Sequence, residues 1–108
     1  MWRGEVWWVS FGASAAGEIP RRRPAVIISN DLANRHLNRV QVVPLSIAGD
    51  GPYPSEAYVT LDGRQHKAMA DQIATVSKGR LGDMLGRLSA ADLRQVEQIV
   101  KLQLGLLS

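Results

Sequence analysis

The chain has 108 residues, of which 45% are apolar and 21% are charged, a composition typical of a single globular domain with one core. It has no cysteine, no apolar run near the roughly 20 residues of a membrane span and no signal-peptide pattern at its start, so we expect a cytoplasmic protein without disulfides or a cysteine-based metal site. Its net charge is +3, and ten of its thirteen cationic side chains are arginine, which suits bidentate contacts with phosphate.

The first predicted element is a strand from Glu5 to Phe11, where most residues are β-branched or aromatic. Side chains alternate along a strand, so three of these residues face one side and three face the other. The two sets are Trp7, Val9 and Phe11 on one face and Val6, Trp8 and Ser10 on the other. Both sets are largely apolar, and we expect this strand to be covered on both faces.

A long loop, a second strand and a short helix are predicted next. Gly12–Pro20 is small, polar and marked by Gly and Pro, as in a surface loop, and the apolar run Ala25–Ser29 indicates a buried strand. Asn30 and the residue after it can cap a helical turn that ends at Leu37. Three polar residues of this helix are expected to face outward: Asn34, Arg35 and His36.

The middle of the chain is predicted to be β-structure with turns. A third strand covers Arg39–Leu45, and Gly49–Pro54, with two glycines and two prolines, is a loop. Asp62-Gly63 marks a hairpin turn. The remaining predicted strands are Glu56–Leu61, Ala68–Val76 and Met84–Leu88.

The end of the chain is predicted to be an amphipathic helix. Ser89 and Asp92 have the spacing of a capping box, and the helix is expected to continue to about Leu107. One apolar face repeats at helical spacing: Leu93, Val96, Ile99, Val100, Leu104 and Leu107. Leu102 and Leu106 lie off that face and are either exposed or part of a dimer contact. Short strands followed by one such helix predict a mainly β protein, a small SH3-like β-barrel with the C-terminal helix packed against it.

The run EIPRRRP from Glu18 to Pro24 is the first candidate for chemistry. Its three arginines, Arg21, Arg22 and Arg23, form a charge run of the kind that is usually solvated. Arg23 differs because it precedes Pro24, which favours extended geometry and makes Arg23 the first residue of the strand. An arginine at the mouth of a strand is held by a rigid scaffold, as a catalytic or binding group must be.

Ser46 is the second candidate, since it ends the run VVPLS beside a glycine-rich loop, where a hydroxyl can point into a cleft or serve ordinary turn chemistry. The two histidines, His36 and His66, each stand alone in polar surroundings. The sequence therefore favours neither a zinc site nor a paired-histidine ribonuclease, and we expect no metal and no cofactor.

Four segments, RGEVWWVSFG, GEIPRRRPAVIISND, VQVVPLS and AMADQIATV, occur in the order and spacing of the MazF/PemK toxins, and the resemblance spans nearly all of residues 1–108. It implies a single domain with the SH3-like barrel and terminal helix, which forms a homodimer. It also implies an endoribonuclease that cuts single-stranded RNA, with mRNA as the expected substrate, and that is neutralised by an antitoxin. Contact with DNA is expected only indirectly, through that antitoxin.

The resemblance also assigns roles to individual residues. Arg23 matches the family's catalytic arginine, and Ser46 stands where the family usually has a threonine, so the hydroxyl is kept. Glu18 matches the acidic residue of the substrate loop, and Gln72 lies in the ADQ block near the RNA path. Further substrate contacts are expected from Arg21, Arg22 and Tyr53, the last as a stacking surface. Ile47-Ala48-Gly49-Asp50 departs from relatives that carry a lysine after the threonine, so base recognition there should differ.

The expected chemistry needs no metal because RNA carries its own nucleophile. The 2′-OH attacks the adjacent phosphorus and expels the 5′-oxygen, which leaves a 2′,3′-cyclic phosphate and a 5′-OH. Arg23 would stabilise the growing negative charge and Ser46 would donate to a non-bridging oxygen. Two alternatives stay open: a barrel that only binds nucleic acid or protein, and a gyrase-poisoning toxin of the same fold. The latter ends in an aromatic tail, whereas this chain has no aromatic residue after Tyr58.

Overall fold

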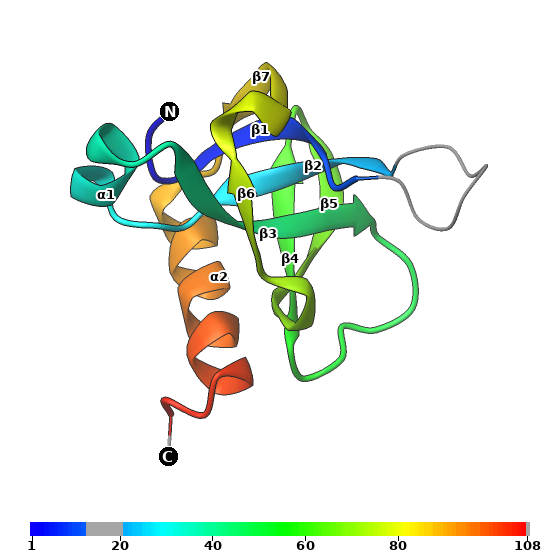
Figure 1. The fold of residues 1–108 in the computed structure, drawn as a ribbon. Helices are drawn as coiled ribbons and strands as arrows, with labels where there is room; N and C mark the ends of the chain where they lie inside the picture. The colour runs from blue at the N-terminus through cyan, green and yellow to red at the C-terminus, as the bar shows by residue number, and fades with distance from the viewer. Residues whose placement is uncertain (13–20, 108) are drawn as a thin grey trace.

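The computed structural model describes residues 1–12 and 21–107, and Figure 1 shows an antiparallel sheet with one long helix against it. The elements are β1 (Glu5–Ser10), β2 (Arg22–Ile27), α1 (Asp31–His36), β3 (Arg39–Ile47), β4 (Glu56–Leu61), β5 (Arg64–Met69), η1 (Ala70–Gln72), β6 (Ala74–Ser77), η2 (Lys78–Arg80), β7 (Leu81–Arg87) and α2 (Ala90–Gln103). The strand order is β4-β5-β3-β2-β1-β7, and β6 pairs with β3. This confirms the predicted barrel-like fold, although the hydrogen-bonded path stays open between β4 and β7. Within these ranges, no helix is long and apolar enough to cross a membrane.

Strand β1 is covered on both faces, as its alternation predicts. Val6 belongs to a core cluster that contains Val96 and Ile99 of α2. Val9 belongs to a second cluster on the other face, against which Trp7 and Phe11 pack. The sheet therefore has one core under α2 and a second core on its opposite face.

Strand β3 holds the sheet together because it pairs with three other strands. Its residues 42–44 pair with β2, residues 39–42 pair with β6 and residues 45–47 pair with β5. Ala68 opposes Leu45 and Ala74 opposes Val42, so this segment advances six residues while β3 advances three. The three extra residues form η1, which is why the predicted strand Ala68–Val76 is wrong as one continuous element.

Several predicted strand boundaries also differ from the structure by one to three residues. Strand β2 begins three residues before the predicted start at Ala25, β3 continues two residues beyond Leu45, and β7 begins three residues before Met84. In β7, Gly82 and Gly86 interrupt the apolar pattern, and the pairing with β1 shifts register twice. The hairpin between β4 and β5 is as predicted, and both of its turn residues have positive φ (51° and 74°), as a type I′ turn requires.

Helix α1 is capped as predicted, because the Asn30 side chain accepts from the backbone N–H of Ala33 at 2.8 Å. The outward orientation predicted for Asn34 is wrong, since this side chain is buried. Its Nδ2 donates to Ser29 O at 2.9 Å and to Asp31 Oδ1 at 3.1 Å, and the Ser29 hydroxyl is 2.5 Å from its Oδ1. A buried asparagine is stabilised by such hydrogen bonds. A sequence pattern shows only that the residue is polar, so it does not distinguish a buried, hydrogen-bonded asparagine from a solvated one.

Helix α2 begins with Ser89 as its N-cap, as predicted, because the Ser89 hydroxyl accepts from the Asp92 N–H at 3.1 Å. The Asp92 carboxylate, expected to complete a capping box, accepts instead from the Thr60 N–H at 2.8 Å.

The helix ends at Gln103, four residues before the predicted end. Leu106 N–H donates to Lys101 O at 2.8 Å, and Gly105 N–H donates to Leu102 O at 3.1 Å, which together form a Schellman motif. Gly105 has φ of 73° and permits this turn. The end of the predicted apolar face therefore leaves the helix and is exposed.

The N-terminal segment is fixed by Glu5, a buried carboxylate at the start of β1. It accepts from Trp2 N–H at 2.8 Å and from Trp7 Nε1 at 3.0 Å, and Arg87 Nη2 of β7 lies 3.3 Å away. Burial raises the pKa of Glu5, but these hydrogen bonds, the N-terminal ammonium and Arg87 outweigh burial and lower it below 4.5.

Asn34→Ala should lower the free energy of unfolding by about 1–3 kcal/mol, because it leaves the partners of a buried amide unsatisfied. Asn38→Ala is the matched control, since Asn38 is exposed and should change stability by less than about 0.5 kcal/mol. Urea denaturation followed by tryptophan fluorescence measures both. Equal effects of the two variants would contradict the role given to Asn34.

Glu5→Gln should reduce the dependence of stability on pH in the acid range. A lowered folded-state pKa contributes stability that is present above the ordinary glutamate value of 4.5 and is lost as pH falls through the folded value. The wild type should therefore lose stability more steeply than Glu5→Gln below pH 4.5. Urea midpoints across the acid range test this, and parallel curves would refute it.

Candidate functional site

The first candidate, Arg23, is the second residue of β2 and is half-buried. It pairs with Val9, so its side chain lies on the face of the second core cluster, just beyond Ala25. Arg22, one residue earlier, lies on the other face, where its guanidinium stacks on the Trp8 ring at 4.6 Å. Arg21 is exposed and precedes the strand. The run of three arginines is therefore divided between two faces of the sheet.

Ser46 is half-buried within β3, not at its end as predicted. Ala25 opposes Pro44, and Arg23 and Ser46, each two residues beyond that pair along its own strand, are on the same face of the sheet. The last β2–β3 pair is at Pro44, and proline lacks the N–H that a hydrogen-bonded ladder needs. Among the described residues, the serine hydroxyl contacts Ile47 O at the long distance of 3.4 Å. One face of the sheet therefore carries a cation and a hydroxyl, both just beyond the last β2–β3 pair.

Lys67 and Tyr58 extend this row across the sheet. Lys67 of β5 opposes Ser46, and Tyr58 of β4 opposes Lys67. We call Tyr58, Lys67, Ser46 and Arg23 the polar row. The end of β3 and the start of β2, the strands that carry Ser46 and Arg23, lie on the same side of the molecule in Figure 1. The sequence analysis did not identify Lys67, because pairing between distant strands leaves no local signal.

The polar row holds the loop that contains Tyr53. Lys67 Nζ lies 3.3 Å from Glu56 Oε1, donates to Asp50 O at 3.1 Å and is 5.6 Å from the centre of the Tyr53 ring. Tyr58 Oη donates to Gly51 O at 2.7 Å. The predicted contact residue Tyr53 is 61% exposed and is placed beside the row by these bonds.

Of the other predicted contact residues, Gln72 is outside the polar row. Gln72 is exposed in η1, and its amide lies 3.6 Å from Met69 Sδ. Glu18 lies outside the described residues. His36 is exposed and His66 half-buried, and they belong to α1 and β5. Residues 1–12 and 21–107 contain no group of three or more His, Asp or Glu side chains that could hold a metal ion.

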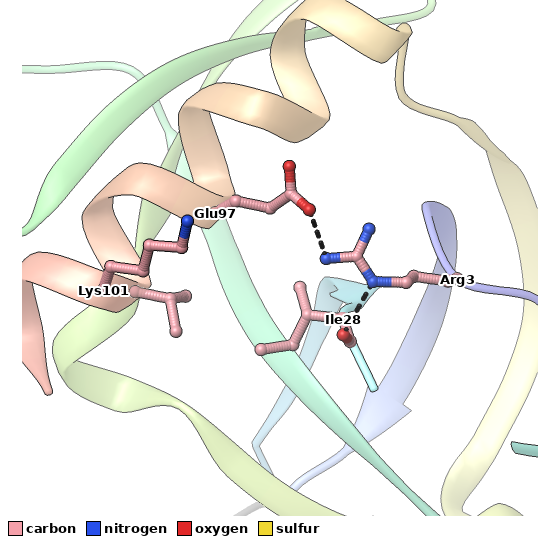
Figure 2. Close-up of a pocket in the computed structure, with 5 residues that line it drawn as sticks. Arg3, Ile28, Glu97 and Lys101 are labelled. Carbon is pink, nitrogen blue, oxygen red and sulfur yellow. Dashed lines mark hydrogen bonds and ion pairs between the residues drawn. The ribbon is translucent and has the colours of Figure 1, made fainter. Parts of the chain in front are cut away.

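A separate cavity of about 150 Å³ lies at the other end of β2, between the N-terminal segment and α2. Figure 2 shows Arg3 and Glu97 pointing toward one another across it, with Nη2 and Oε2 2.7 Å apart. Arg3 Nε also donates to Ile28 O at 3.0 Å. The Arg3–Glu97 ion pair connects the N-terminal segment to α2. Because Glu97 compensates the charge of Arg3, this arginine is not a free cation in the cavity.

An arginine and a hydroxyl on one face of a small antiparallel barrel are groups of the kind that bind phosphate. Comparison with known families makes the class specific. Residues 2–104 match the family model described as the PemK-like, MazF-like toxin of type II toxin–antitoxin systems. The chain belongs to this family.

Individual relatives match the chain over nearly all of their length. The chain is 38% identical to endoribonuclease MazF9 of Mycobacterium tuberculosis, over 100% of this chain and 99% of that protein. It is 25% identical to the endoribonuclease toxin MazF of Escherichia coli, over 94% and 92% of the two chains. Among solved structures, a mycobacterial endoribonuclease in complex with its cognate antitoxin has a TM-score of 0.83 at 27% identity, covering 98% and 96%. A MazE–MazF complex from Deinococcus radiodurans also has a TM-score of 0.83, at 25% identity and the same coverage.

Proposed function

We propose that this protein is a sequence-specific, metal-independent endoribonuclease toxin that cuts single-stranded RNA by attack of a 2′-OH on the adjacent phosphorus. The observation that carries the proposal is that Arg23 and Ser46 are on one face of the sheet, each just beyond the last β2–β3 pair, in a member of the MazF-like family. The relatives named as endoribonucleases favour an enzyme over a barrel that only binds and over a gyrase-poisoning toxin.

Arg23 supplies the positive charge in this mechanism. As the 2′-oxygen attacks and the 5′-oxygen departs, negative charge grows on the non-bridging oxygens of the phosphate. A guanidinium held by a strand stabilises that charge and donates a hydrogen bond to the leaving oxygen, which takes its proton from water. A guanidinium has no acceptor atom and is therefore poorly suited to remove the 2′-OH proton. Glu18 is the proposed base or base-edge acceptor.

Ser46 donates its hydroxyl to a non-bridging oxygen. Its single long contact to Ile47 O leaves the hydroxyl free to turn toward a substrate. Threonine would restrict the same rotation, because a second heavy atom on Cβ narrows χ1. Arg21, Arg22, Tyr53 and Gln72 are proposed as contacts along the RNA, outside the reacting centre.

The proposal includes the partners that the family implies. The chain forms one domain over residues 1–108, acts as a homodimer in the cytoplasm and is neutralised by a cognate antitoxin, through which it contacts DNA. Solved structures of similar toxins with their antitoxins support this association. Leu102 and Leu106, which are 46% and 70% exposed, are apolar surface that a partner could cover.

Arg23→Ala should abolish cleavage while the protein stays folded and dimeric, with a loss of at least 10²–10³-fold in rate expected for one preorganised donor. Arg94→Ala removes an exposed arginine of α2 and serves as the matched control. A fluorogenic single-stranded RNA assay in EDTA measures both, with circular dichroism and light scattering for fold and size. Undiminished cleavage by Arg23→Ala would remove the proposal, and activity that requires an added metal would remove its metal-free step.

Ser46→Ala should slow cleavage by about 10²-fold or more, since it deletes the second donor to the phosphate. Ser46→Thr should keep or raise the rate, because the hydroxyl stays and the rotamer is stiffer. Single-turnover rates at saturating RNA separate this effect from binding. If Ser46→Ala cleaves as fast as Ser46→Thr, the hydroxyl has no role in the chemical step.

A further inference from the structure

A second hollow lies beside the polar row, between the Tyr53 loop and η1. It has a volume of about 370 Å³ and is lined by Tyr53, Pro54, Ser55, Glu56 and Asp71. We call it the η1 pocket. Its size is within the range of small-ligand sites, about 300–1,000 Å³. No residue of this pocket other than Tyr53 was a candidate in the sequence analysis.

The walls of the η1 pocket are held by hydrogen bonds. Tyr53 N–H donates to Glu56 Oε1 at 3.0 Å, and Glu56 N–H donates back to Tyr53 O at 2.8 Å, which closes a tight turn. Ala70 N–H of η1 donates to Ser55 O at 3.0 Å, and the Ser55 hydroxyl bonds the Gln103 side chain at the end of α2. The loop and η1 are therefore joined to each other and to α2.

The two carboxylates of the pocket are in different electrostatic situations. Glu56 forms the ion pair with Lys67 and accepts from the Tyr53 backbone, so its charge is compensated. Asp71 is exposed, and within the described part of the chain it makes no ion pair or side-chain hydrogen bond. Asp71 is therefore the acceptor that this pocket offers to a ligand.

Tyr53 supplies the apolar part of the pocket. Lys67 Nζ lies 5.6 Å from the centre of the Tyr53 ring, and Tyr53 is 61% exposed. Part of the ring surface is therefore open to stacking by a planar group of a ligand. An aromatic face together with a carboxylate acceptor is a combination that recognises an unpaired nucleobase: the ring stacks on the base, and the carboxylate accepts from N–H donors on the base edge.

The pocket is placed to receive a base of an RNA strand whose phosphate is at Arg23. Lys67, which holds Glu56 and Tyr53, is on β5, two strands from β2 and Arg23. Neighbouring paired strands are about 4.8 Å apart, so these two residues are separated by about 10 Å or more. A nucleotide one or two positions from the cut can reach across that separation.

We propose that the η1 pocket binds one nucleobase of the RNA substrate and selects guanine, with Tyr53 stacking on the base and the Asp71 carboxylate accepting from its N1–H and N2–H₂ donors. The inference rests on the proposed ribonuclease function and adds to it a recognition residue, Asp71, and a chemical rule. Guanine carries two adjacent N–H donors that match the two oxygens of a carboxylate, whereas adenine and cytosine offer one exocyclic amine and uracil offers one N3–H. The pocket therefore favours guanine at one position of the recognised motif.

The test compares wild type with Asp71→Asn on RNA oligonucleotides in which each position near the cut is varied through all four bases. At one position the wild type should cleave the guanine-containing strand about tenfold faster than the other three, as expected for one specific base contact. Asp71→Asn should lose this preference, because an amide has one acceptor oxygen and places an NH₂ group against the second guanine donor. Asp62→Asn, at the β4–β5 turn, makes the same charge change outside the pocket and should keep the wild-type preference.

Affinity for uncleavable 2′-O-methyl oligonucleotides, measured by fluorescence anisotropy, separates this inference from the proposed catalysis. Tyr53→Leu should weaken binding, and Tyr53→Phe should retain it because the ring is kept. If the wild type cleaves RNA but Asp71→Asn has an unchanged base preference in both assays, the pocket inference is wrong and the ribonuclease proposal stands. If the wild type binds with the predicted preference but never cleaves, the catalytic proposal fails and the pocket inference stands. If the wild type does not bind RNA, both fail.

Discussion

The pairing register of β3 is the constraint on which the rest of the molecule depends. This one strand is opposed by β2 on one edge and by β5 and β6 in succession on the other. A shift of one residue would move every side chain of β3 to the other face. Ser46 would then leave the face shared by Arg23 and Lys67, and Val43 and Leu45 would leave the core beneath α2. The same register therefore fixes the core and brings the candidate catalytic groups together.

The elements that the sequence predicts correctly are those with strong local signals. The apolar alternation of β1, the Ser89 cap of α2 and the Asp62-Gly63 turn are each set by residues within a few positions, so pattern and turn chemistry are sufficient. The predictions that fail depend on distant partners. The η1 interruption exists because β5 and β6 pair with different parts of β3, and Asn34 is buried because Ser29 and Asp31 bond it. The resemblance found Arg23 and Ser46, but only the strand register shows that they share one face of the sheet. Lys67 and Asp71 were missed for the same reason, because their neighbours are distant in sequence.

The arrangement separates the proposed chemistry from the proposed recognition. Arg23 and Ser46 are on strands, where backbone pairing holds side chains within the small tolerances that transition-state stabilisation needs. Tyr53 and Asp71 lie on a loop and a short 3-10 turn, whose sequence can vary without disturbing the sheet. Lys67 joins the two regions, because it belongs to the polar row and bonds the Tyr53 loop. Changes in that loop can therefore alter which RNA is recognised while the reacting groups stay in place.

Analysis of the ends produced from one defined RNA oligonucleotide tests the central claim most directly. Purified protein in EDTA is incubated with a cleavable strand and with the same strand carrying a single 2′-deoxy nucleotide on the 5′ side of the cut, and the products are identified by mass spectrometry. The account predicts a 2′,3′-cyclic phosphate and a 5′-OH from the first strand and an intact second strand, because the nucleophile is the substrate's own 2′-OH. A 5′-phosphate end, or cleavage of the deoxy-substituted strand at the same bond, would contradict it.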